Sequence, residues 1–153
     1  MATFDSKPFP TGQLRQPYRR ADVELHGVDQ AVPSYEGRIF LDNPEADRET
    51  APTPENRYLG SFFVFGKVEC WGDDESHCRE PDERRKFDRR RNPTRWAKVR
   101  VRTPDGLLSR LLEQADDEVT LNLVAVVPDR EDYRRFDPAD VLRFERISIV
   151  TYA

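Results

Sequence analysis

The sequence predicts an all-β protein: an antiparallel β-sandwich or barrel of about six to seven strands with one short helix. Six segments have the alternation, or the aromatic and β-branched content, of strands. Only one segment has the leucine spacing of an amphipathic helix, and twelve prolines against seven glycines indicate many turns and loops. The length of 153 residues fits one domain, and a βαβ fold would need helices between most strands.

The first strands follow a segment without periodicity. Residues 1–18 are rich in proline, so we expect an irregular N-terminal arm, followed by a single β-sandwich domain over residues 19–153. Residues 20–28 alternate apolar and polar side chains, as a half-buried strand does, and residues 34–41 repeat the pattern. Residues 42–56 are polar and rich in proline, and loops of this length are often functional.

The second half of the chain supplies the remaining strands and the helix. Residues 96–102 alternate again, and residues 119–127 place five apolar side chains on one face. Residues 141–152 form the last strand, where a change of apolar phase predicts a bulge near residues 145–146. A helix is expected to start at Thr103, because a capping hydroxyl there precedes a proline at the first helical position. Its leucines have helical spacing: Leu107, Leu108, Leu111 and Leu112.

An aromatic strand is the feature that points to function. It reads Ser-Phe-Phe-Val-Phe and ends just before Gly66. Successive side chains of a strand point to opposite faces, so Phe62 and Val64 share one face while Phe63 and Phe65 share the other. Whichever face packs on the core, another Phe is left in need of cover, and aromatic residues are enriched where partners bind. We therefore expect Phe65 to be solvent-accessible on a partner-binding surface.

Three side chains that could bind a metal follow this strand. They are Cys70, His77 and Cys78, and the two cysteines are the only ones in the chain. Thiolates with an imidazole suit Cu(I) or Zn(II), so these residues are a candidate copper site. The C-x7-C spacing is not that of a familiar zinc knuckle and a fourth ligand is missing. A local disulfide and two free thiols therefore remain as alternatives.

Charge patterning excludes several classes of function. Residues 84–102 are a basic run interleaved with Phe87 and Trp96, as in some single-strand binders. Acidic neighbours and a net charge of −4 instead favour a solvated loop or a patch that docks an acidic partner, and argue against nucleic acid.

No apolar run approaches the ~18 residues of a membrane span. The start has no hydrophobic signal region, so we expect a cytoplasmic protein, although export with a partner stays open.

No catalytic constellation is recognisable. The chain has two histidines and no nucleophilic serine motif, Walker loop or dinucleotide-binding glycine pattern. We therefore expect that this chain alone is not an enzyme.

Several stretches carry a resemblance to a known family. In order over about residues 18–152 they are ADVELHGVDQAVPSYEGRIFLDNP, YLGSFFVFG, CWGDDESHC, the leucine helix and VLRFERISIVTY. Together they resemble the C-terminal β-sandwich domain of tyrosinases and molluscan haemocyanins, the type-3 copper proteins. In that family the domain lies like a lid over a separate helical domain. Six histidines of that helical domain hold two copper ions. A Leu, Phe or Tyr of the lid projects into the copper pocket as a placeholder for substrate, and matching SFFVFG places that residue at Phe65.

The resemblance implies a role without tyrosinase activity, because two histidines cannot build a six-histidine site. It implies a free-standing accessory lid that binds a separately encoded tyrosinase-like copper oxidase and shields or assists its copper site. Phe63, Phe65 and Gly66 would form the interface. Two alternatives remain: a copper-binding chaperone using Cys70, His77 and Cys78, and a protein-interaction module with no copper role.

Overall fold

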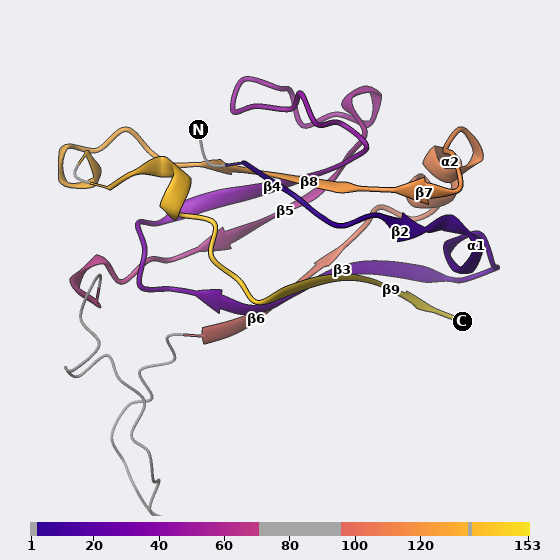
Figure 1. The fold of residues 1–153 in the computed structure, drawn as a ribbon, viewed down its shortest axis with the longest axis horizontal. Helices are drawn as coiled ribbons and strands as arrows, with labels where there is room; N and C mark the ends of the chain where they lie inside the picture. The colour runs from indigo at the N-terminus through magenta and orange to yellow at the C-terminus, as the bar shows by residue number, and fades with distance from the viewer. Residues whose placement is uncertain (1–2, 71–95, 135) are drawn as a thin grey trace, which may run out of the picture.

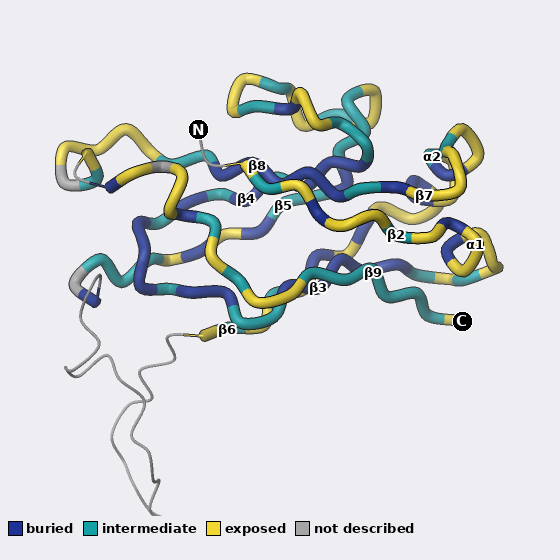
Figure 2. The backbone as a smooth tube through the Cα atoms, viewed as in Figure 1, coloured by how far each residue is buried: buried dark blue, intermediate teal, exposed yellow. Residues whose placement is uncertain are grey.

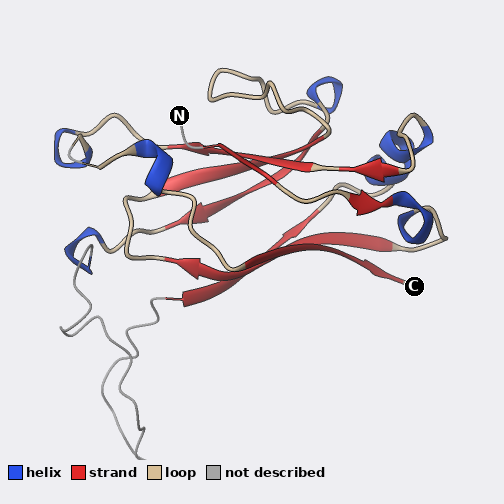
Figure 3. Ribbon diagram, viewed as in Figure 1, coloured by secondary structure: helices blue, strands red, loops and turns tan. Residues whose placement is uncertain are grey.

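Antiparallel strands dominate the structure, as the sequence predicts. The computed structural model describes residues 3–70, 96–134 and 136–153. Its strands, drawn in Figures 1 and 3, are β1 (Thr3–Asp5), β2 (Phe9–Pro10), β3 (Arg20–Asp29), β4 (Tyr35–Leu41), β5 (Tyr58–Val64), β6 (Trp96–Arg102), β7 (Glu118–Val119), β8 (Leu121–Val126) and β9 (Arg146–Tyr152). Its α-helices are α1 (Thr11–Leu14) and α2 (Leu107–Glu113), and its 3-10 turns are η1 (Pro54–Asn56), η2 (Val68–Cys70), η3 (Glu131–Tyr133) and η4 (Pro138–Asp140).

The strands form two layers that pack face to face. One layer has the order β1-β8-β4-β5 and the other has the order β6-β3-β9. The short pair β2-β7 lies at one end beside α1 and α2, as Figure 1 shows. Leu123 of β8, Ile39 of β4 and Leu25 of β3 are fully buried in one core cluster. Figure 2 shows the same distribution, with the buried segments concentrated on strands of both layers. The chain is therefore a β-sandwich.

The N-terminal segment is part of this sandwich, and the prediction of an irregular arm is wrong for the described residues from 3 to 18. β1 pairs with β8, and β2 pairs with β7. Ser6 exchanges hydrogen bonds with Leu121: its backbone N–H donates to the carbonyl of Leu121, and its hydroxyl accepts from the N–H of Leu121 at 2.8 Å. Strands of two or three residues are too short to show an alternation in sequence, so their tertiary contacts alone define them.

The helix also begins later than the capping motif predicts. α2 starts at Leu107, with Gly106 at its N-cap in the left-handed conformation (φ 71°). The hydroxyl of Thr103 instead donates to the carbonyl of Ala21 at 2.9 Å, in a buried position. Thr103 therefore links the end of β6 to β3. The N-cap position of α2 is occupied by Gly106, and glycine tolerates a positive φ.

The predicted bulge lies in a different strand. β9 begins at Arg146 and keeps an unbroken register with β3 to Tyr152. The irregularity is in β3 itself, where the pairing with β6 shifts between Leu25 and Val28. Gly27 sits there with φ 63°, and a Cβ at this position would lie 2.5 Å from Cγ of Glu145. The side chain of Glu145 covers the bulge in β3. The change of apolar phase within residues 141–152 therefore reflects this contact with β3 and not a bulge in β9.

The strand expected over residues 119–127 is divided in two. β7 ends at Val119 and β8 begins at Leu121. Between them, the N–H of Thr120 donates to the carboxylate of Asp42 at 2.6 Å. The alternation continues through this break, which explains why the sequence does not reveal it.

Candidate functional site

The aromatic strand presents two phenylalanines to solvent. Among the described residues, the exposed large hydrophobic side chains are Phe63, Phe65 and Trp96. Phe63 is 65% exposed and Phe65 is 82% exposed, whereas Phe62, on the other face of the strand, is only 5% exposed. The prediction that Phe65 is solvent-accessible is therefore confirmed, while its role as a placeholder stays a prediction.

The buried face of β5 is held by a close contact across the sheet. Phe62 pairs with Gly37 of β4, and a Cβ at Gly37 would lie 2.2 Å from Cζ of Phe62. The ring of Phe62 therefore occupies the space over a glycine, and its edge meets the ring of Tyr35 with centroids 5.9 Å apart. This packing fixes β5 in the sheet, so the alternation of the strand places Phe63 on the outer face.

The turn after Phe65 is also fixed. The N–H of Gly66 donates to the hydroxyl of Ser34 at 2.9 Å, and the N–H of Lys67 donates to the carbonyl of Gln30 at 2.7 Å. A Cβ at Gly66 would lie 1.7 Å from the carbonyl oxygen of Val32. The backbone on both sides of Phe65 is thus packed or paired, while the side chain itself projects into solvent.

A loop covers the other end of the same sheet face. Phe40 and Val124 point to the outer face of the β1-β8-β4-β5 layer, yet both are buried, because Ala46 of the segment between β4 and η1 packs on them. Arg38 fastens this segment by donating to the carbonyl of Arg48 at 3.1 Å. This segment, predicted as a loop of a length that is often functional, therefore has a structural role, and Phe63 and Phe65 lie beyond its cover.

The candidate metal site falls largely outside the described residues. Cys70 is buried and disulfide-bonded. A disulfide sulfur offers no thiolate to a metal. His77 and Cys78 lie outside the described part of the chain, and within that part no group of three His, Cys, Asp or Glu side chains could hold a metal ion. Copper binding by Cys70, His77 and Cys78 stays a prediction without support from these residues.

The described end of the basic run forms a ladder of ion pairs. Residues 84–95, including Phe87, lie outside the described part of the chain. On the outer face of β6, Lys98 contacts the carboxylate of Glu24 at 2.9 Å, and Arg100 donates to the same carboxylate at 2.9 Å. The next carboxylate on β3 belongs to Asp22, which is fully buried beneath Arg20 and accepts from its Nε at 2.7 Å. The cations of β6 therefore join it to β3.

Sequence reasoning missed this ladder. Asp22 and Glu24 occupy the polar positions of an alternating strand, which predicts that both are exposed. Both are instead buried, because cationic side chains cover them, and one of these, Arg100, lies 76 positions from Glu24 in the sequence. The available signal was opposite charge at alternate positions of two strands: acids on β3 and bases on β6.

We expect the stability contributed by Glu24 to be present at neutral pH and lost in acid. A hydrogen bond from Lys98 is the main reason that the pKa of Glu24 lies below its ordinary value of 4.5; the Arg100 hydrogen bond adds to this, and burial opposes it. A carboxyl with a lowered pKa stabilises the fold above its unfolded-state pKa, and that stability disappears as the pH falls through the lower folded-state value. Urea unfolding should therefore show wild type more stable than Glu24→Gln at about pH 7, and the difference should shrink as the pH falls below 4.5, the ordinary pKa of the group.

The matched control removes a carboxylate from an exposed pair. Asp105 accepts from Arg102 at 2.9 Å with both side chains exposed, and such pairs contribute little. Asp105→Asn should leave unfolding almost unchanged at every pH. A difference between Glu24→Gln and wild type that stays constant from neutral to acid pH would contradict the assigned role of the Glu24 charge.

Comparison of the chain with protein families, with curated proteins and with solved structures found no match. The resemblance to the tyrosinase and haemocyanin lid therefore stays a prediction made from the sequence. No helix formed by the described residues is long and apolar enough to cross a membrane. The features of the described surface that bear on function are the fixed strand, its two exposed rings and the polar face of the opposite layer.

Proposed function

We propose that this chain is a non-catalytic accessory β-sandwich that binds a separately encoded, tyrosinase-like copper oxidase and shields or assists its copper site. The observation that carries the proposal is the exposure of Phe65, at 82%, on a backbone that is itself held in place. The resemblance of SFFVFG to the family's strand and turn supports the same residue. Phe63 and Gly66 complete the proposed interface.

Rigidity of the backbone favours a docking role for the exposed ring. Phe65 lies between the last paired residue of β5 and the hydrogen-bonded N–H of Gly66. A side chain on a backbone that is held on both sides loses little conformational freedom when it enters a pocket, so less of the interaction energy is lost to ordering. Full burial of a Phe side chain contributes about 1.5–3 kcal/mol. That energy corresponds to roughly 10–100-fold in affinity, which is enough for one ring to dominate a small interface.

We expect Phe65→Ala to weaken partner binding by roughly 10–100-fold while the melting temperature stays nearly unchanged. The ring has few neighbours to lose in the isolated chain, because it is mostly exposed. Phe62→Ala, on the buried face of the same segment, should instead cost about 3–5 kcal/mol of stability. Phe65→Leu should retain much of the binding, since leucine also serves as a placeholder in the family. Calorimetric titration and thermal unfolding measure the two effects separately.

The partner used for this titration should be a type-3 copper oxidase from the same organism, purified with its copper. Binding that depends on Phe65, together with a change in phenol oxidation by the partner, supports the proposal. A melting temperature that falls steeply in Phe65→Ala would make Phe65 a core residue and remove the proposed interface. Binding through Phe65 to a protein without copper, with none to the oxidase, would favour the interaction module with no copper role.

A further inference from the structure

The two layers of the sandwich have unequal numbers of strands in the described part of the chain. Four of the described strands form the layer β1-β8-β4-β5, and three form the layer β6-β3-β9. β5 meets β6 on one side of the molecule, where a Cβ at Gly60 would lie 2.7 Å from Cγ1 of Val101. On the other side Phe4 of β1 packs edge-on against Phe144, just before β9, with ring centroids 4.7 Å apart. β9 is therefore the edge strand on the β1 side.

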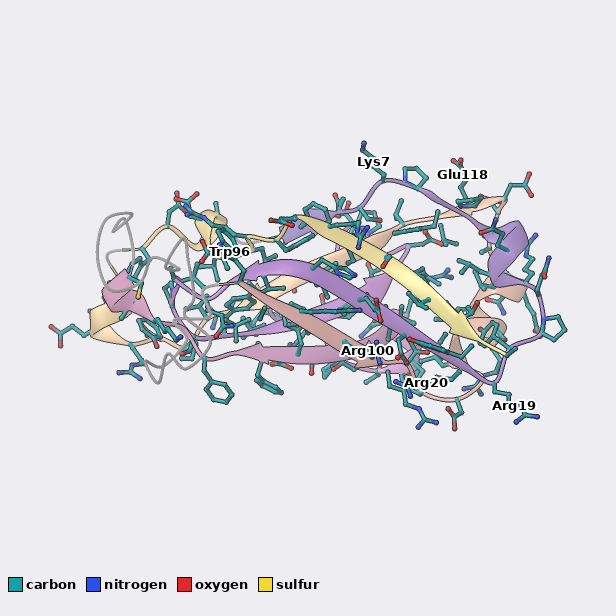
Figure 4. All side chains as sticks on the ribbon, turned by 90° about the horizontal axis from the view of Figure 1, so that it is seen from below. Lys7, Arg19, Arg20, Trp96, Arg100 and Glu118 are labelled. Atoms are coloured by element: carbon teal, nitrogen blue, oxygen red, sulfur yellow. The ribbon has the colours of Figure 1, made fainter. Side chains whose placement is uncertain are left out.

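The stretch between β1 and β2, together with strand β7, extends past the free edge of β9. Lys7 lies between β1 and β2, and Glu118 belongs to β7. In Figure 4, which views the molecule from the β6-β3-β9 side, both labelled residues lie beyond β9. The stretch between β1 and β2 and strand β7 therefore overhang the edge of β9.

The main-chain groups of β9 alternate between β3 and the free edge. The carbonyl of Tyr152 accepts from the N–H of Arg19, so Tyr152 directs its polar backbone groups toward the β3 side. Alternate residues of a strand direct these groups to opposite sides. Thr151, Ile149 and Ile147 therefore direct N–H and C=O away from β3. Among the described strands, β9 pairs with β3 alone.

Among the described strands of the two layers, the other edge strands β1, β5 and β6 carry features that discourage pairing, and β9 does not. β1 has three residues, β5 is interrupted by a register shift near Gly60, and β6 alternates cations at Lys98, Arg100 and Arg102. Short strands, irregularities and charged side chains are the usual protection of sheet edges. After Arg146, β9 reads Ile-Ser-Ile-Val-Thr-Tyr, with no charge, no proline and an unbroken register.

Apolar side chains next to this edge are incompletely covered. Phe4, Phe9, Phe144, Ile147 and Ile149 pack on the core but are only partly buried. A further strand paired with β9 beneath the overhang would have two effects. It would cover this side of the core, and it would form hydrogen bonds with the free N–H and C=O groups of β9. On the opposite face of β9, the exposed Arg146 would be available to an acidic side chain.

We propose that the free edge of β9 binds an extended segment of a partner protein, which becomes the fourth strand of the β6-β3-β9 layer. The segment has apolar side chains at alternate positions, facing Ile147 and Ile149, and an acidic residue opposite Arg146. Main-chain pairing supplies affinity and the alternate side chains supply specificity, as in other cases of strand addition. A second copy of this chain is a poorer occupant, because antiparallel pairing of two β9 strands brings the overhanging segments of both copies to the same side of the joined sheet.

The probe for this edge is a fluorescein-labelled peptide with the sequence of residues 146–152 and a glutamate in place of its tyrosine. Paired antiparallel about Ile149, it places this glutamate opposite Arg146, an opposite-charge cross-strand pair, and its arginine opposite Tyr152, a favourable cation–π pairing. Anisotropy with the full chain should show saturable binding. Thr151→Pro removes one free-edge N–H, and proline leaves the β3 hydrogen bonds of the neighbouring residues in place. It should weaken binding by about tenfold or more, whereas Thr151→Ala, which keeps the N–H, should not.

Amide hydrogen exchange gives a second readout that does not depend on the proline variant folding. Peptide binding should slow exchange at Ile147, Ile149 and Thr151 and leave Ser148 and Val150, already paired with β3, unchanged. Absence of saturable binding, equal binding by Thr151→Pro and Thr151→Ala, or slowed exchange confined to other strands would each overturn the proposal. Sedimentation showing that the chain dimerises through β9 would replace the partner segment by a second copy.

Discussion

Leu123→Asp is expected to abolish folding. Leu123 is fully buried at the centre of β8 and pairs with Phe4 on one side and Ile39 on the other. An aspartate there must either keep an unpaired charge between the two layers or be protonated at a cost of several kcal/mol, and the packing of the leucine is lost as well. Together these costs are comparable with the roughly 5–15 kcal/mol by which domains are typically stable. Circular dichroism should show loss of the β-sheet signal at 25 °C, and no cooperative thermal transition should remain.

A matched variant places the same charge on the other face of the sheet. Ser61 of β5 points to the outer face, and its cross-strand partner is Arg38. Ser61→Asp should fold with a melting temperature close to that of wild type. If Leu123→Asp kept a cooperative transition near that of Ser61→Asp, the assignment of Leu123 to the core between the layers would be wrong.

Gly66→Ala is expected to destabilise the domain by roughly 1–3 kcal/mol or more, the range of overpacking costs. The added Cβ would lie 1.7 Å from the carbonyl oxygen of Val32 and 2.6 Å from the carbonyl carbon of Pro33. Both are backbone atoms, so the β3–β4 connection itself must move. For a chain of this size, each kcal/mol lowers the melting temperature by about 2–4 °C, which differential scanning calorimetry resolves.

Gly12 provides the control for this substitution. It lies in α1, and a Cβ there would meet nothing within 4 Å. Gly12→Ala should leave stability unchanged or raise it slightly, because alanine restricts the unfolded chain more than glycine does. Equal melting temperatures for Gly66→Ala and Gly12→Ala would show that the turn after Phe65 is loosely held, and the rigid presentation of that ring would lose its basis.

The sequence predicts the parts of this fold that are encoded by alternation. Residues 20–28 and 96–102 form strands as expected, because their apolar positions face one core over seven or more residues. The same alternation separates Phe62 from Phe63 and Phe65, which predicts that one face of the strand carries exposed rings. The packing of Phe62 over Gly37 decides which face is buried. β1 and β2 could not be predicted in this way, because they are defined by pairing with residues more than a hundred positions away.

Local motifs fail where a distant contact competes for the same side chain. Thr103 has the sequence context of a helix cap, yet its hydroxyl is used by the carbonyl of Ala21. Glu24 has the alternation of an exposed residue, yet Lys98 and Arg100 cover it. In both cases the decisive partner lies in another strand, and the pattern within the segment contains no information about it.

The segment between β4 and η1 limits the apolar surface that the unbound domain exposes to solvent. By burying Phe40 and Val124 and packing against Tyr58, it leaves the rings of Phe63 and Phe65 as the apolar end of that face. Large contiguous apolar patches promote unspecific adhesion between molecules, whereas small ones are tolerated by freely diffusing proteins. Shortening this segment would expose Phe40 and Val124 in addition to Phe63 and Phe65, and the apolar area of this face would increase. The proline-rich segment thus keeps the exposed apolar surface of this face small.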